Sequence, residues 1–269
     1  RWPALLFPSW RSRLFWELKV RAAIRRADLV FTVSETSRRD ILQAFRLPAA
    51  RVRVVSDAVD PRFKPPAHPG AAQAVLRRYG LEPGQRFVLY VGGISPHKNL
   101  ETLVRAFGRW RRDQGTVAMK LVLVGDFAAD VFYSSYPSLR DLIASSALEG
   151  DVRFAGFVPD DDLVHFYGAT DVLVLPSLSE GFGLPALEAM ACGAPVIASE
   201  AGALPEVVGN AGLLFPPRSA DSLAAALGRV LGDATLRAGM GARGLVQAAQ
   251  FTWDASARAA LAGFQELAG

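Results

Sequence analysis

The sequence predicts an α/β protein built on a doubly wound parallel sheet with helices on both faces. Eight short apolar runs alternate along the chain with longer stretches whose apolar residues recur at helical spacing. Such alternation is typical of βαβ units, in which the strands pair in parallel. The expected strands span residues 28–33, 52–55, 87–91, 120–124, 152–154, 172–175, 195–198 and 212–215.

Composition indicates a well-packed globular chain. The 269 residues are 51% hydrophobic, which excludes a disordered or fibrous protein. A single cysteine, Cys192, excludes an internal disulfide and favours a small packing role. Three scattered histidines predict no metal cluster, and no apolar stretch approaches the length of a bilayer-spanning helix. We therefore expect a cytoplasmic protein or one bound peripherally to a membrane.

Proline density divides the chain. Four prolines within residues 56–70 predict a linker. Residues 1–55 offer too few strands for a sheet of their own, so we expect them to be the end of a domain that begins upstream. Residues 71–250 then form the main domain. From about residue 222 the chain becomes helical, and residues 251–269 form the last helix.

Charge is unevenly distributed. Residues 1–53 contain twelve Lys/Arg against four Asp/Glu, whereas the remainder contains eighteen against twenty-two. The basic stretch 11–26 also holds several large apolar residues, which suits an anionic membrane surface or an acidic partner. A solvated helix with its apolar side against the protein explains the same pattern. No nucleic-acid motif accompanies the charge, so we predict no nucleic-acid partner.

The most informative element follows the strand at 172–175. There, Glu180 and Glu188 bracket a turn that contains Gly181 and Gly183 and opens a helix over 184–191. Glycines let backbone N–H groups approach an anion closely, and a helix start adds unpaired amides and a positive dipole end. A carboxylate such as that of Glu188 can accept hydrogen bonds from two ribose hydroxyls. The alternative is that both acids only stabilise the helix N-terminus electrostatically.

A second glycine loop follows the strand at 87–91. Gly92 and Gly93 lead to Lys98 and Asn99, and a helix with apolar residues at helical spacing begins at residue 100. Lys98 would present a mobile charge to a diphosphate, and Ser95 or Asn99 could cap the helix. An ordinary βα turn with an exposed lysine is the competing interpretation.

An acidic triplet, Asp160, Asp161 and Asp162, could suggest a metal site. The triplet stands between Pro159 and an apolar helical pattern, where acids favour a helix N-terminus. We therefore predict a helix start and no metal.

Together these residues resemble the retaining family 4 glycosyltransferases, which have the two-domain GT-B fold and transfer sugars from nucleotide donors. The similarity runs through nearly the whole chain in order. Residues 32–37 look like the last strand of the amino-terminal domain, 90–99 like the diphosphate loop, and 124–126 and 156–158 like further strand ends that face the donor. Residues 180–190 are the most specific part.

The resemblance implies the role of each site residue. Glu188 should bind the ribose, Lys98 the diphosphate and Glu180 the donor sugar, which makes these three the expected catalytic residues. The implied substrate is a UDP- or GDP-linked hexose, with no cofactor and no metal. Residues 156–158 should frame the base, and residues 181–184 should supply backbone amides. The further donor-binding residues implied are Gly92, Gly93, His97, Asn99, Gly125, Gly156, Phe157, Val158, Gly181, Phe182, Gly183 and Leu184.

Two departures from the family pattern stand out. Many relatives carry an arginine where this chain has Gly93, and His97 is a candidate substitute. The family's acceptor domain, with a glycine-rich loop and a catalytic histidine, lies upstream of the strand at 28–33. We therefore expect residues 1–55 to be the tail of an acceptor domain, residues 71–250 to be the donor-binding domain, and residues 251–269 to cross back towards the amino-terminal domain.

The resemblance thus implies a hexosyltransferase that acts with retention on a glycan or glycolipid acceptor in cell-envelope assembly, at the inner face of the plasma membrane. The acceptor domain would be supplied in cis or in trans, and without it the chain would bind donor without transferring it. The alternatives are a non-catalytic nucleotide-sugar-binding subunit and a sugar-nucleotide epimerase of the same fold.

Overall fold

The computed structural model describes residues 9–66, 69–115, 118–126 and 135–268. Its strands occur at all eight predicted places, with ends that differ by at most a few residues. They are β1 (Val30–Thr32), β2 (Val52–Val54), β3 (Arg86–Val91), β4 (Met119–Val124), β5 (Val152–Gly156), β6 (Val172–Leu175), β7 (Val196–Ser199) and β8 (Leu213–Phe215).

Helices fill most of the intervals between the strands. The α-helices are α2 (Trp10–Arg26), α3 (Glu35–Phe45), α4 (Pro69–Arg78), α5 (Leu100–Asp113), α6 (Tyr136–Ser145), α7 (Asp160–Ala169), α8 (Leu184–Ala191), α9 (Leu204–Val208), α10 (Ala220–Gly232), α11 (Ala234–Ala248) and α12 (Trp253–Ala268). Two short 3-10 helices cover Ala49–Arg51 and Pro96–Lys98. The acidic triplet opens α7, as predicted.

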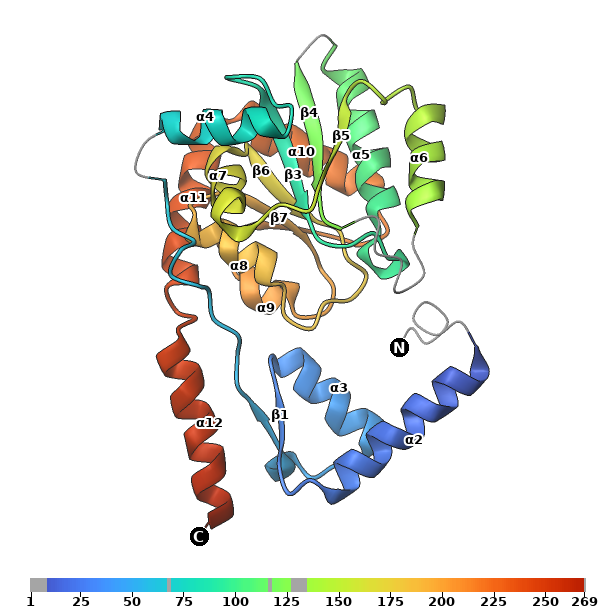
Figure 1. Cartoon of the computed structure of the whole chain (residues 1–269), viewed down its shortest axis with the longest axis vertical. Helices are drawn as coiled ribbons and strands as arrows, with labels where there is room; N and C mark the ends of the chain where they lie inside the picture. Colours follow the sequence, from blue (N-terminus) through green and yellow to red (C-terminus); the bar gives the residue numbers. More distant parts are fainter. Residues whose placement is uncertain (1–8, 67–68, 116–117, 127–134, 269) are drawn as a thin grey trace.

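The main sheet has six parallel strands in the order β5-β4-β3-β6-β7-β8, and β1 and β2 form a separate parallel pair. Chain order runs outward from β3 in one direction and from β6 in the other, so the winding reverses between these two neighbours. Right-handed crossovers then place α5 and α6 on one face, and α7, α8 and α9 on the other. Figure 1 shows the helices on both sides of the sheet. The predicted doubly wound fold is confirmed.

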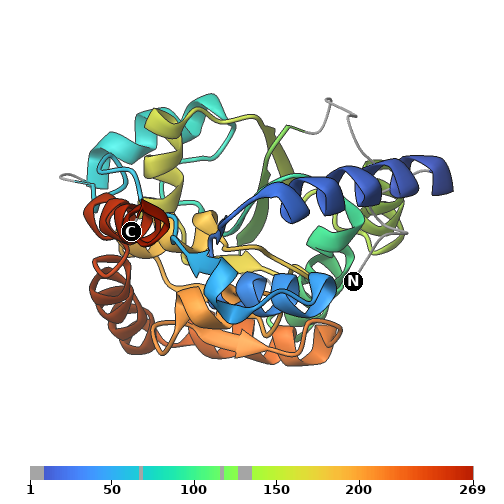
Figure 2. The same ribbon diagram turned by 90° about the horizontal axis from the view of Figure 1, so that it is seen from below.

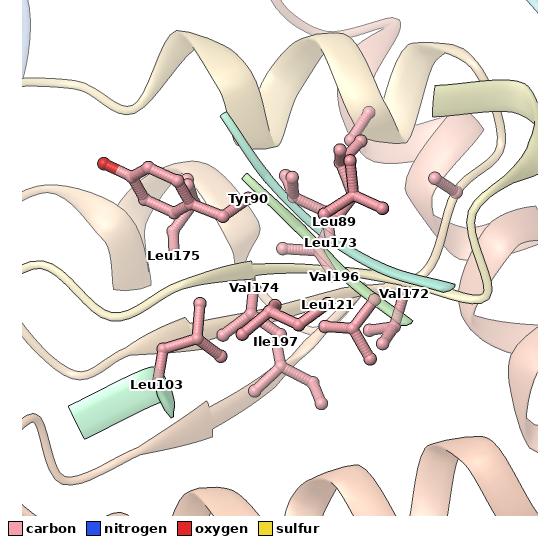
Figure 3. Close-up of a cluster of buried hydrophobic side chains, with 14 of the residues drawn as sticks. Leu89, Tyr90, Leu103, Leu121, Val172, Leu173, Val174, Leu175, Val196 and Ile197 are labelled. Carbon is pink, nitrogen blue, oxygen red and sulfur yellow. The ribbon is translucent and has the colours of Figure 1, made fainter. Parts of the chain in front are cut away.

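The hydrophobic core is formed around the central strands of this sheet, because helices cover both of its faces. Leu89 on β3 and Leu173 on β6 are adjacent in register and fully buried, together with Leu121 on β4 (Figure 3). Near-continuous Val/Leu runs are what a parallel sheet buried on both faces requires. The sheet is therefore a rigid base for the loops at its edges.

The amino-terminal unit, which comprises α2, α3, β1 and β2, lies beyond the carboxyl edge of the main sheet (Figure 1). The last helix, α12, leaves the main unit and packs against the amino-terminal unit. The rings of Phe31 and Phe264 meet edge to face with centroids 5.3 Å apart, and Arg53 forms an ion pair with Glu266. Gly263 allows this approach, because a Cβ there would lie 2.8 Å from the Phe31 ring.

Large apolar side chains remain exposed on the two outer helices. No residue of α2 is buried, and Trp10 is 70% exposed and Phe15 64% exposed. On α12, Leu261 and Phe264 are also more than half exposed. Figure 2 places α2 and α12 on opposite sides of the β1–β2 pair. Within the ranges described above, no helix combines the length and apolar character that a bilayer crossing requires.

Candidate functional site

The predicted site residues gather at the carboxyl edge of the main sheet. Gly92 follows β3, and the Glu180 loop follows β6, so both loops leave the two strands between which the winding reverses. Open α/β sheets bind ligands in the crevice at this position. The fold therefore brings together two loops that are more than 80 residues apart in the sequence.

The first loop is shaped by Gly92. This residue has a φ of 146°, and a Cβ there would lie 2.8 Å from Tyr90 Oη. The buried Tyr90 hydroxyl donates a hydrogen bond of 2.8 Å to the carbonyl of Gly93. The N–H of Gly92 donates to the carbonyl of Val124, whereas the N–H of Gly93 has no acceptor among the described residues. Gly93 is thus one residue of this loop whose amide donates to none of the described residues.

The second loop offers more amides. The N–H groups of Gly181, Phe182, Gly183 and Leu184 donate no hydrogen bond to any residue that the structure describes. Gly183 has a φ of 109° and is the N-cap residue of α8, so the positive end of the helix dipole lies at these amides. Four such donors at a helix start are suited to binding an anion, and we refer to them as the candidate anion-binding surface.

An ion pair joins the two loops. Lys98 Nζ lies 2.7 Å from Glu180 Oε1, and both side chains are largely shielded from solvent. Glu180 Oε1 also accepts a hydrogen bond of 2.7 Å from Ser177 Oγ, and the N–H of Leu178 donates to the carbonyl of His97 at 2.7 Å. The predicted sugar-binding and diphosphate-binding residues are therefore side by side.

His97 and Asn99, both expected to bind the nucleotide-sugar donor, make other contacts in the structure. Burial and the neighbouring charge of Lys98 lower the pKa of His97, so its ring is neutral at pH 7 and supplies no charge for the arginine that relatives carry at the Gly93 position. The Asn99 amide donates to the carbonyls of Pro176 and Pro217, at 2.9 Å and 2.7 Å. Asn99 stands at the N-cap of α5 but makes no side-chain cap hydrogen bond, contrary to expectation. The Asn99 side chain therefore holds together the loops that contain Pro176 and Pro217.

Glu188 lies within the first two turns of α8 and is partly buried. Its Oε2 accepts a hydrogen bond of 2.7 Å from the hydroxyl of Tyr167, a fully buried residue of α7. Burial raises the pKa of Glu188, and the hydrogen bond from Tyr167 opposes this shift. Sequence reasoning missed Tyr167. Its signal was a tyrosine on the apolar face of a predicted helix, where the hydroxyl needs a partner.

The residues expected to frame the base differ in how far they are exposed. Gly156, at the end of β5, has a φ of 75°, and its Cβ position is open. Phe157 is 71% exposed and offers a ring face, whereas Val158 is buried in the core and offers only backbone. Gly125 follows β4, and its N–H donates to the carbonyl of Gly156. At the second loop, the Phe182 ring packs edge to face on Phe251, so this residue too presents only its backbone.

The carboxylates of the acidic triplet form ion pairs with arginine side chains. Arg62 lies within 4 Å of carboxylate oxygens of Asp160 and Asp161, and Asp162 pairs with Arg78 at 2.6 Å and accepts a hydrogen bond from the Tyr79 hydroxyl at 2.6 Å. The described residues contain no group of His, Cys, Asp and Glu side chains suited to a metal ion. Cys192 is buried, and burial beside Glu188 raises the pKa of its thiol to about 12.

Comparison with known proteins gives relatives along most of the chain. The chain is 36% identical over 242 residues to O-antigen chain mannosyltransferase B of Escherichia coli, covering 89% of this chain and 61% of that protein. It superposes on sucrose-phosphate synthase of Thermosynechococcus elongatus with a TM-score of 0.80 and 31% identity, covering 96% of this chain and 62% of the other. For Anabaena HepE in complex with UDP-glucose, the TM-score is 0.78 and the identity 25%, with coverage of 94% and 66%.

The doubly wound sheet, with two amide-rich loops where its winding reverses, and the superposition on sucrose-phosphate synthase place the chain in the GT-B class of α/β proteins. The chain belongs to the family described as glycosyl transferases group 1, whose model matches residues 73–246. Residues 1–63 match the model described as Glycosyltransferase Family 4. The chain spans less than two thirds of the length of the relatives named above.

Proposed function

We propose that this chain binds a nucleotide-diphosphate hexose and takes part in its transfer, with retention, to a hydroxyl of a glycan or glycolipid acceptor. The observation that supports this best is the Lys98–Glu180 contact, because it brings a cation to the residue that precedes the candidate anion-binding amides of residues 181–184. Resemblance to a mannosyltransferase of O-antigen chains and to a UDP-glucose complex agrees with such a donor.

Each residue has a distinct role in the proposed reaction. The diphosphate would lie against the amides of Gly93 and residues 181–184, with Lys98 neutralising its charge, while Glu188 accepts hydrogen bonds from the ribose and Glu180 from the sugar. The acceptor oxygen bonds to the anomeric carbon as the bond from that carbon to the diphosphate breaks. The acceptor proton passes to the departing diphosphate. Positioning and charge stabilisation would supply the catalysis, and with Lys98 and the backbone amides stabilising the diphosphate we expect transfer to need no metal and no cofactor.

We propose that the exposed apolar side chains of α2 and α12 pack against the remainder of an acceptor domain, present in cis or in trans. The exposed Trp10, Phe15 and Phe264 are of the kind that protein contacts cover. Protection of α2 from hydrogen exchange in a longer polypeptide would support this. Binding of α2 to anionic vesicles, with the same helix unprotected in the longer polypeptide, would instead favour a peripheral site at the inner face of the plasma membrane.

Calorimetry with UDP, GDP and their hexose derivatives tests the donor site. Lys98→Ala and Glu188→Ala should each weaken binding roughly 10- to 100-fold, as expected for lost hydrogen bonds to charged groups. Lys64→Ala, which removes an exposed linker lysine, is the matched control and should bind as wild type. Wild-type affinity in both site variants would contradict the proposal.

Binding without turnover, once an acceptor domain is supplied, would favour a non-catalytic subunit. Donor conversion without any acceptor would favour an epimerase.

A further inference from the structure

The amino-terminal unit contacts the second glycine loop directly. Ser34, the N-cap residue of α3, is fully buried, and its Oγ donates a hydrogen bond of 2.7 Å to the carbonyl of Gly181. Ser37 Oγ donates to the same carbonyl at 3.2 Å. These serines precede Gly181 by 147 and 144 positions, so the contact is made only by the fold.

The bonded carbonyl fixes an amide of the candidate anion-binding surface. The carbonyl of Gly181 and the N–H of Phe182 belong to one planar trans peptide and point in opposite directions. Two hydroxyls that hold this carbonyl therefore aim the Phe182 N–H away from α3. That N–H is one of the donors without an acceptor among the described residues.

Both sides of the loop are held. On the amino-terminal side, Glu206 Oε1 and Oε2 accept hydrogen bonds from the N–H groups of Glu35 and Thr36, at 2.9 Å and 3.2 Å, which keeps the start of α3 against the main unit. On the opposite side, the N–H of Ala203 donates to the carbonyl of Glu180 at 3.0 Å. Gly202 packs so closely that a Cβ there would lie 2.4 Å from Glu180 backbone atoms. The loop is clamped between α3 and residues 202–203.

We infer that Ser34 and Ser37 are positioning residues for the donor diphosphate, acting through the peptide that joins Gly181 to Phe182. The amino-terminal unit thus contributes to the geometry of the donor site as well as to the acceptor side. This inference rests on the proposed donor function. The inference goes beyond that function by assigning part of the donor site to residues of the amino-terminal unit.

The test measures UDP and GDP affinity by calorimetry and hydrogen exchange of residues 178–186. Ser37→Ala and Ser34→Ala should weaken binding about fivefold each, the equivalent of one hydrogen bond of about 1 kcal/mol. Exchange of 178–186 should become faster in both variants without ligand. Ser37→Thr, which keeps the hydroxyl, should restore affinity and exchange.

Two controls separate positioning from general destabilisation. Ser34 also accepts the N–H of Ser37 as a helix cap, so Asp233→Ala, which removes the cap of α11, is its match. Ser145→Ala removes an exposed hydroxyl that donates to a local carbonyl on α6 and matches Ser37→Ala. Both controls should keep wild-type affinity.

The outcomes distinguish the two proposals. If wild type binds and both serine variants keep its affinity and exchange, the inference is overturned and the donor function stands. If wild type binds neither nucleotide, the proposed function fails and the role of the two serines in donor binding fails with it. Exchange of 178–186 would then report only whether the serines hold the loop.

Discussion

The hydroxyl of Tyr167 donates a hydrogen bond of 2.7 Å to the carboxylate of Glu188, joining α7 to α8 beneath the candidate site. Burial and the charge of Glu188 raise the pKa of Tyr167 well above its ordinary value. The hydroxyl therefore keeps its proton and remains a donor at every pH at which the protein would be studied. A carboxylate proposed to recognise ribose is thus held in one orientation by a buried group.

Tyr167→Phe should weaken binding of UDP or GDP about three- to tenfold, which corresponds to the loss of one hydrogen bond to a carboxylate. The loss should grow as pH falls, because the hydrogen bond lowers the pKa of Glu188 and its removal lets that pKa rise. Calorimetry between pH 5 and 8 measures this. Tyr79→Phe removes a similar hydroxyl bond to Asp162 and should leave affinity unchanged. Equal affinities at every pH would refute the orienting role.

Glu188→Gln should raise the melting temperature at pH 7 while weakening nucleotide binding. Burial raises the pKa of Glu188 in the folded protein, so the folded state holds this proton more tightly than the unfolded state does. Ionised Glu188 therefore costs stability above its folded pKa. The gain from glutamine should vanish below about pH 4.3, where glutamate is protonated in both states. Thermal melts from pH 4 to 8 measure the difference. Glu149→Gln, at an exposed position, serves as the control.

Asn99→Ala should lower the free energy of unfolding by about 2–4 kcal/mol, because two carbonyls lose their donor and alanine is strained at positive φ. Asn99 has a φ of 58°, and its Oδ1 also accepts a hydrogen bond from Thr102. Urea denaturation gives the value. Asn210→Ala, at the exposed end of a turn, should change stability little. A stable Asn99→Ala variant that loses only nucleotide binding would show that the side chain contacts the donor instead.

Gly202→Ala and Gly84→Ala form a matched pair. Both glycines have positive φ, 60° and 74°, so alanine should cost about 1 kcal/mol of backbone strain at either site. A Cβ at Gly84 meets nothing within 4 Å, whereas one at Gly202 would displace the backbone of Glu180. Only Gly202→Ala should therefore weaken nucleotide binding, at least tenfold. Thermal melts and calorimetry on both variants test this, and equal affinities would show that the loop adapts.

Most of the fold could be predicted from local sequence patterns. Residues 87–91 and 172–175 are apolar without interruption, and such runs form strands covered on both faces regardless of detail elsewhere. Gly92 directly follows the first run, and Gly181 lies in the loop after the second. Their positions were therefore predictable, because the carboxyl ends of parallel strands share one edge. The Lys98–Glu180 contact follows from that shared edge.

The finer structure of the site could not be predicted in this way. The contact of Ser34 with Gly181 depends on how two units approach each other, and no local spacing encodes that. The role of Asn99 depends on two proline carbonyls from distant loops. His97 suggests a cation by residue type, but burial and a neighbouring lysine keep it neutral. In each case tertiary surroundings decide the chemistry.

The chain passes between its two units twice, through residues 55–66 and again along α12. Ser256 Oγ forms a hydrogen bond to the carbonyl of Ser56, so the two passages are tied to each other at one side of the molecule. Two adjacent tethers on one side define a rotation axis. Any opening of the units would therefore be a hinge motion about this side of the molecule. It would move Ser34 and Ser37 away from Gly181, with the greatest displacement farthest from Ser56.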